Sequence, residues 1–296
     1  FSSTPSIRPL YGRVMSKYGW RKHPVFGNRR FHKGIDIPAS IGAPVQATAE
    51  GYVEFSGWDG GYGWQILYES ISRDNLLQAD EVIGKGWTED IQQLNFQGVY
   101  TWDRSIRVTV KIPYVLNAER ENLINGQKIS QTDQGLGDIT IALPLKKYFN
   151  LMRRTGSWTL APQLRIPTGS KDSYDVWERA WGSAIFLGYE TETRNYFFAT
   201  GISYWMFDSN KDDFIHSSLD IGWNAKDNLQ LLIENDFHDD SAGKNYYLVG
   251  PAIYWRQNDI RHYRFEFKRE INPTGPDNKV DHIGGNKISI GVGFVY

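Results

Sequence analysis

Histidine, acid and serine side chains that could carry acid–base chemistry lie close together in one part of the sequence. Asp236 and His238 are two residues apart, and His216 is followed by Ser217 and Ser218. A histidine within hydrogen-bonding distance of a carboxylate or a hydroxyl group can act as a general base. Neighbouring residues of an extended chain point to opposite sides, so at most one of the two serines shares a face with His216. A hydrolytic site is therefore one hypothesis for this region.

A second hypothesis is that the same residues belong to a larger polar lining. Charged and histidine side chains recur at alternate positions across the region, and both signs of charge are present. Such side chains need water or ion-pair partners, and the wet interior of a barrel supplies both. A salt-bridged lining is the interpretation that we favour. The predicted lining residues are His216, Asp220, Glu234, Asp236, His238, Arg256, His262, Arg264, Glu266, Lys268 and Glu270.

The elements that would position these side chains are β-strands. In the last segment Ile288, Ile290 and Val292 share one face, while Lys287 and Ser289 share the other. Twelve segments alternate in this way, and each is near the roughly 9–11 residues that a tilted strand needs to cross a bilayer. They are 62–72, 93–103, 106–116, 136–147, 156–167, 180–190, 195–207, 213–224, 229–238, 246–256, 262–270 and 287–296. The residues expected to face lipid include Ile106, Val108, Val110, Leu229, Leu231, Tyr263, Phe265, Ile290, Val292 and Phe294.

The connections between these segments alternate in length. Segments 103–104, 190–194, 225–227 and 257–258 are short, whereas 117–135, 168–179 and 271–285 are long. Barrels of the bacterial outer membrane have short turns on the periplasmic side and longer loops outside. The sequence therefore predicts an all-β fold, a twelve-stranded antiparallel transmembrane barrel with both ends in the periplasm.

Composition agrees with a barrel and excludes several other classes. The chain has no run of about 18 apolar residues, so a transmembrane helix is excluded. Its 11 Trp, 17 Tyr and 15 Phe suit aromatic girdles at two membrane interfaces. The absence of cysteine excludes disulfides, and a net charge of −1 gives no sign of a nucleic-acid partner. A soluble β-sandwich or lipocalin-like barrel is the alternative, but it accounts poorly for the charged inner faces.

Three short stretches give the barrel a family resemblance. They are YTWDRSIRVTVKIPYV (100–115), GLGDITIALPLKKYF (135–149) and LAPQLRIPTGS (160–170). They resemble the outer-membrane barrels associated with meta-pathway phenol degradation. The resemblance implies a channel in the outer membrane for small solutes, hydrophobic or aromatic ones among them. Outer-membrane lipid and a small-molecule solute are then the expected partners, and hydrolysis of membrane lipid remains an alternative.

Residues 1–61 are a different kind of sequence. The stretch 12–63 resembles the start of an M23 (LytM-type) zinc metallopeptidase, a family that cleaves peptidoglycan cross-bridges. Its Gly-x-Arg-x-His-Pro element matches Gly19, Arg21, His23 and Pro24. The resemblance implies that the family's zinc-binding His-x-x-x-Asp pair corresponds to His32 and Asp36, shown in the sequence as HKGID.

The zinc site implied by this resemblance is incomplete. The family adds a His-x-His element on a later strand, and this chain contains no His-x-His. Two protein ligands are fewer than the three of a usual catalytic zinc site. We therefore predict two domains, a periplasmic M23-like fragment at 1–61 and a barrel at 62–296, with Zn²⁺ the one cofactor suggested and catalysis not expected. The fragment could be a degenerate wall-binding module that meets peptidoglycan, a fusion or a truncated domain. A tethered zinc endopeptidase is the alternative.

Overall fold

The computed structural model describes residues 8–10, 12–22, 29–32, 34–38, 45, 61–103, 105–151, 154–170, 176–193, 195–208, 211–226, 228–258 and 260–295. Contacts between Cα atoms divide the chain into two compact units, Phe1–Glu54 and Phe55–Tyr296. Within the described ranges, no helix has the length and apolar character needed to span a membrane.

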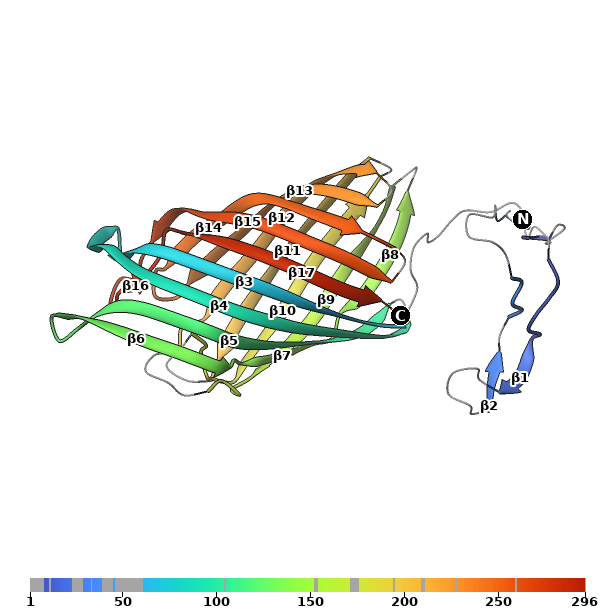
Figure 1. Ribbon diagram of the computed structural model, residues 1–296, viewed down its shortest axis with the longest axis horizontal. Helices are drawn as coiled ribbons and strands as arrows, with labels where there is room; N and C mark the ends of the chain where they lie inside the picture. The colour runs from blue at the N-terminus through green and yellow to red at the C-terminus, as the bar shows by residue number, and fades with distance from the viewer. Residues whose placement is uncertain are drawn as a thin grey trace. The chain divides into compact units, whose positions relative to one another are not determined.

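The second unit is a closed antiparallel barrel (Figure 1). Strand β17 pairs with β3 from Gly285↔Arg73 to Val295↔Gly63, which closes the wall. A crossing is one passage of the chain from one end of the barrel to the other. Strands β6, β7 and β8 together make one crossing, and β16 is only a two-residue bridge. The described strands therefore make twelve crossings. This confirms the predicted barrel. Its strands are β3 (Gly61–Gln78), β4 (Glu81–Asp103), β5 (Ile106–Ile124), β6 (Gln127–Leu136), β7 (Ile139–Ala142), β8 (Leu145–Leu151), β9 (Arg154–Ile166), β10 (Gly182–Glu192), β11 (Tyr196–Phe207), β12 (Phe214–Lys226), β13 (Leu229–Asp240), β14 (Asn245–Arg256), β15 (Arg261–Thr274), β16 (Asp281–His282) and β17 (Gly285–Val295).

Alternation along the strands separates an apolar outer face from a polar inner one. On β17, Ile290 is 49% exposed, whereas its neighbour Ser289 is fully buried. On β15, Phe265 and Phe267 are exposed and Glu266 between them is buried. A barrel wall in lipid requires this pattern, because apolar side chains meet the acyl chains and polar ones turn inward.

Two hairpins extend further than the sequence predicted. Strands β3 and β4 continue to a turn at Ala79 and Asp80, and β5 and β6 continue to a turn at Asn125 and Gly126 (Figure 1). The expectation of a long loop at 117–135 was therefore wrong. Asn125 and Gly126 have φ angles of 51° and 76°, and two consecutive positive φ values are what a tight two-residue hairpin turn requires.

The crossing predicted at 136–147 is interrupted twice rather than continuous. Strand β6 ends at Leu136, β7 covers only Ile139–Ala142, and β8 begins after Pro144. Proline has no N–H for the strand ladder, so a break at this position is expected. The carbonyl group of Pro144 still accepts a hydrogen bond from Arg107 N at 3.1 Å. The crossing therefore remains attached to β5 across its break.

A connection between β9 and β10 packs against the inner wall of the barrel. Val176 and Trp177 lie on a buried cluster made by Ile91, Val115 and Ala118, which are inward-facing residues of β4 and β5. The main-chain N–H of Val176 donates to the carboxylate of buried Asp133 at 3.0 Å. The apolar contact and the hydrogen bond hold this loop, residues 176–181, inside the long-connection end of the barrel.

A second loop covers the same end. Residues 275–284 join β15 to β17, and Ile283 and His282 within them are fully buried, as is Leu76 of β3. Bridge β16 pairs Asp281 and His282 with the end of β3. The N–H of Gly275 donates to the carbonyl of Ala79 at 2.8 Å. The loop therefore folds onto the β3–β4 hairpin instead of extending into solvent.

The first unit is described over short stretches only. Strands β1 (Gly19–Lys22) and β2 (Arg29–His32) form an antiparallel pair in which Gly19 lies opposite His32. Gly19 has a φ of 124°, a conformation that glycine adopts without strain. The predicted motif residues His23 and Pro24 lie outside the described residues, as does Tyr296, the last residue of the predicted strand 287–296.

Candidate functional site

Charged residues of β13 and β15 meet one another inside the barrel. Lys268 Nζ lies 2.9 Å from Glu234 and 2.6 Å from Asp236. Arg264 donates to both carboxylate oxygens of Glu234 at 3.2 Å and also contacts Glu266. Glu234, Glu266 and Lys268 are buried. Their mutual pairing is what permits this, because a buried charge without a partner destabilises a fold strongly.

The candidate acid–base residues join this network in a way that the sequence did not indicate. His216 Nε2 lies 3.5 Å from Asp236 Oδ1, so His216 and not His238 is the histidine beside that acid. His238 stacks on Tyr246 with ring centroids 5.0 Å apart. Within the described residues, the serine hydroxyl bonded to His216 is that of Ser203, and it donates to the main-chain oxygen. Asp220 lies opposite Glu234 in the strand register. These contacts do not pair a serine nucleophile with a histidine base.

Glu270 is held where β15 approaches the covered end. Its Oε1 accepts hydrogen bonds from Arg73 Nε at 2.9 Å and from Arg73 Nη2 at 2.7 Å. Its Oε2 accepts the main-chain N–H groups of Gly284 and Gly285. Arg73 also binds Glu89 at 2.7 Å. These contacts join the wall formed by β3, β4 and β15 to the start of β17.

Asp281 joins two more parts of the barrel through the loop at 275–284. It lies 2.6 Å from Lys244, in the turn between β13 and β14, and 3.7 Å from Arg120 of β5. Burial alone would raise the pKa of Asp281, but the two cations outweigh burial and hold that pKa well below its usual range. A carboxyl group with a depressed pKa stabilises the fold above its unfolded-state pKa and loses this effect only as pH falls through the folded value. The contact therefore persists in moderately acidic solution.

A further polar cluster was missed by the sequence analysis. Glu69 of β3 accepts a hydrogen bond from Gln93 at 2.8 Å and contacts Asn95 and Lys287. Glu69, Gln93 and Asn95 are buried. The alternation in 62–72 placed Glu69 opposite Tyr68 and so could have assigned it to the inner face. The pattern could not show that β17 would bring Lys287 beside it.

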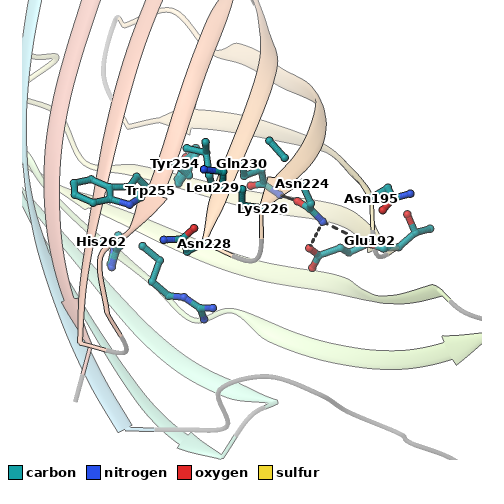
Figure 2. Close-up of a pocket in the computed structure, with 13 residues that line it drawn as sticks. Glu192, Asn195, Asn224, Lys226, Asn228, Leu229, Gln230, Tyr254, Trp255 and His262 are labelled. Atoms are coloured by element: carbon teal, nitrogen blue, oxygen red, sulfur yellow. Dashed lines mark hydrogen bonds between the residues drawn. The ribbon is translucent and has the colours of Figure 1, made fainter. Parts of the chain in front are cut away.

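A cavity of about 840 Å³ opens at the end of the barrel where the short turns lie (Figure 2). Arg256 and His262 from the predicted lining are among the residues that line it. Asn224 donates to Glu192 at 2.8 Å across this cavity and accepts a hydrogen bond from Gln230 at 2.8 Å. The cavity is thus bordered by amide, carboxylate and guanidinium groups, which suit a hydrated solute.

The candidate metal ligands of the first unit lie beside each other. His32 Nε2 is 3.2 Å from Asp36 Oδ1, and His32 Nδ1 donates to the carbonyl of Lys17 at 3.1 Å. The hydrogen bond of Nδ1 orients the ring so that Nε2 faces Asp36, and ligand histidines of many zinc sites are held through their other nitrogen in the same way. No group of three histidine or acidic side chains suited to a metal occurs among the described residues. Among the described residues, those present therefore fit half of a zinc site and do not complete a catalytic one.

Two family models match consecutive stretches of the chain. Peptidase family M23 matches residues 30–78, which include His32 and Asp36. A family described as the putative MetA-pathway of phenol degradation matches residues 78–181. Both resemblances predicted from the sequence are confirmed. The first match runs past the predicted boundary at residue 61 and includes all of β3, which is paired on both sides within the barrel.

Curated relatives match short stretches of the chain. The DD-carboxypeptidase/endopeptidase Mpg of Neisseria meningitidis serogroup B is 48% identical over 75 residues, which cover 25% of this chain and 17% of that protein. The L-Ala--D-Glu endopeptidase of Bacillus subtilis strain 168 is 47% identical over 53 residues, which cover 18% of this chain and 16% of that protein. The chain therefore spans less than a fifth of the length of these relatives.

Solved structures match the barrel. An outer-membrane channel from Pseudomonas putida F1 superimposes with a TM-score of 0.68 and 10% identity, covering 83% of this chain and 99% of that one. The KdgM porin in complex with disordered oligogalacturonate gives a TM-score of 0.46 and 7% identity, covering 78% of this chain and 99% of that one. The first of these likenesses establishes the fold. The chain therefore combines a segment similar to M23 peptidases with a twelve-stranded barrel of the outer-membrane type.

Proposed function

We propose that this protein is an outer-membrane channel for small solutes, with hydrophobic or aromatic molecules among them. The observation that carries the proposal is the closed wall with an apolar outer face and a charged inner face, open at one end through a cavity of about 840 Å³. The eleven predicted lining residues would then act as the polar surface of the pore.

The amino-terminal segment would have a supporting role in this proposal. Barrels of this type start and end in the periplasm, where peptidoglycan lies, so a segment before β3 would face the cell wall. The similarity to M23 peptidases supports a peptidoglycan-facing appendage, and the incomplete ligand set supports one without catalysis. A tethered zinc endopeptidase would need a third ligand beside His32 and Asp36, and the described residues provide none. A lipid-modifying enzyme is the less favoured alternative, because among the described residues the ring of His216 contacts Asp236, and the serine hydroxyl bonded to His216 reaches its main-chain oxygen and not its ring.

Zinc binding and release of muropeptides distinguish a non-catalytic, peptidoglycan-facing segment from a tethered zinc endopeptidase. With His32 and Asp36 as its metal ligands, the purified chain is expected to bind Zn²⁺ weakly and to release no muropeptides from peptidoglycan. The measurement is chromatography of soluble products after incubation with and without Zn²⁺. The controls are His32→Ala and, as a histidine substitution in the barrel, His238→Ala. Release that His32→Ala abolishes and His238→Ala leaves intact would contradict the proposed inactive role.

Channel activity is tested by single-channel current in planar bilayers. The native chain is expected to show a small conductance with weak preference between cations and anions, because both signs of charge line the interior and loop 176–181 narrows it. Trp177→Ser should raise the conductance by roughly twofold or more, since it removes the side chain that packs on the inner wall and pore width governs conductance. Trp181→Ser, in the same loop but 48% exposed, is the matched control. Absence of current in all three proteins would eliminate the channel proposal.

A further inference from the structure

One arginine of the barrel interior has no acidic partner. Arg165 lies on the inner face of β9, opposite Gly182 of β10, and it is partly exposed. Its Nε is buried without a hydrogen-bond acceptor. Across the described residues, its guanidinium group makes no ion pair or hydrogen bond, unlike the paired cations Arg73, Arg264 and Lys268. A bound anion would stabilise a guanidinium group that is enclosed in this way.

Nearby acidic groups are already engaged elsewhere. Glu178 and Asp138 lie near enough to interact electrostatically with Arg165. However, Glu178 pairs with Lys211 at 3.6 Å. The carboxylate of Asp138 accepts main-chain N–H groups, including that of Arg179 at 2.8 Å. The guanidinium group of Arg165 therefore retains its capacity to bind an anionic ligand.

Aromatic rings surround the guanidinium group instead of carboxylates. Its central carbon lies 4.5 Å from the centroid of Trp205, 5.3 Å from that of Phe207 and 6.0 Å from that of Phe214. The rings continue along the inner wall, because His238 lies 4.8 Å from Phe214. Trp205 is buried, and its cation–π contact holds the guanidinium group in place, whereas Phe207 and Phe214 are partly exposed and offer faces on which another ring can stack.

Small residues on β10 make this arrangement possible. Gly182 lies between Arg165 and Phe207 in the register of three adjacent strands. A Cβ atom at Gly182 would lie 2.8 Å from the ring of Phe207 and 3.4 Å from Cβ of Arg165. Ala184, the next inward residue, lies opposite Trp205 and is buried. Glycine and alanine on the central strand therefore allow the arginine and the rings to approach each other above it.

We propose that Arg165, Trp205, Phe207 and Phe214 form a binding site for an aromatic carboxylate within the barrel. The guanidinium group would hold the carboxylate through paired N–H donors, and the ring of the ligand would stack against the aromatic wall. The site deepens the proposed channel function, on which it rests for access of the solute. It assigns to the channel a preference for ring-bearing anions over neutral rings and over aliphatic acids.

Equilibrium binding to the full chain in detergent tests the site without requiring transport. The probes are benzoate, phenol, which keeps the ring without the carboxylate, and cyclohexanecarboxylate, which keeps the carboxylate without the aromatic ring. Benzoate is expected to bind more tightly than the other two. Arg165→Gln should weaken benzoate binding by about tenfold or more while changing phenol binding little, because a charge-assisted pair is lost. Titration calorimetry supplies the affinities.

Two further variants make the result specific. Arg107→Gln removes a different inward-facing arginine, one that donates to Tyr148, and should leave benzoate binding unchanged. Trp205→Leu should weaken benzoate and phenol alike. Equal losses in Arg165→Gln and Arg107→Gln would overturn the proposal, as would an Arg165→Gln protein that binds benzoate like the native chain. If the Arg165→Gln protein fails to assemble, the affinities of the native chain for the three probes test the proposal instead. A native chain that does not bind benzoate more tightly than phenol and cyclohexanecarboxylate would overturn the proposed site.

The outcomes separate this inference from the channel proposal. Channel current without saturable benzoate binding would overturn the aromatic-carboxylate site alone. Benzoate binding that depends on Arg165, in a protein that carries no current, would uphold the site and eliminate transport.

Discussion

Lys268→Met is expected to lower the free energy of unfolding of the barrel by about 3–5 kcal/mol. The substitution leaves Glu234 and Asp236 without the cation that lies 2.9 Å and 2.6 Å from them. Glu234 is 2% exposed, so water cannot replace the lost partner easily. The measurement is urea-induced unfolding of the protein in lipid vesicles, followed by tryptophan fluorescence.

The controls for this result separate loss of pairing from loss of a lysine. Lys226→Met removes an exposed lysine at the end of β12 and should change stability little. Adding Glu234→Gln and Asp236→Asn to Lys268→Met should recover much of the loss, because these changes remove the excess negative charge that the loss of Lys268 leaves in the interior. Equal destabilisation by Lys226→Met and Lys268→Met would contradict a buried ion-pair network.

Ile290→Arg is expected to destabilise the barrel by about 2–4 kcal/mol, the cost of a cation on the lipid face near mid-membrane. Ile290 is 49% exposed on β17 and lies between Tyr68 and Phe265 in the register. Asn286→Arg is the matched control, because Asn286 lies on the same face of the same strand beside Arg269 and Ser72. A cation there is expected to cost about 0–1 kcal/mol.

The measurement for this pair is again unfolding in vesicles. A loss for Ile290→Arg that is no larger than the loss for Asn286→Arg would mean that Ile290 does not face lipid. The comparison therefore tests the assignment of the outer face separately from the ion pairs of the inner face.

The twelve crossings could be predicted because alternation is a local property of the chain. Each strand shows its two faces in its own sequence, as Ile290 and Ser289 do on β17, and the order of turns follows from the connection lengths. The length of the β5–β6 hairpin was missed although Asn125 and Gly126 are a strong hairpin signal. The segments on either side of this turn are polar, and for that reason 117–135 was interpreted as a long loop.

The arrangement of the interior could not be predicted, since it depends on which side chains meet across strands. The alternation put Lys268 and Asp236 on inner faces but gave no indication that they are 2.6 Å apart. Trp177 was placed in a long loop, and only the buried cluster on β4 and β5 explains why that loop turns inward. Arg165 could not be predicted as a site residue, because its aromatic neighbours come from β11 and β12, 40 or more residues away in the sequence.

The incomplete zinc site of the first unit shows a different limit of prediction from sequence. The sequence identified His32 and Asp36 through a family motif, and they lie 3.2 Å apart. Ligand count, however, is a property of a complete fold, and the described residues provide no third ligand for these two. A motif can therefore locate part of a site without establishing the chemistry of the whole.

The most direct test of a membrane-spanning barrel with a polar interior is spin-label accessibility along β15. The chain has no cysteine, so single cysteines at residues 262–270 can each carry one nitroxide label. In lipid vesicles, labels at 263, 265 and 267 should collide readily with oxygen, which concentrates in the bilayer. Labels at 264, 266 and 268 should show low oxygen collision, because those side chains point inward. Oxygen accessibility with a period of two residues supports the barrel, and accessibility without that period, or with its phase reversed, would contradict it.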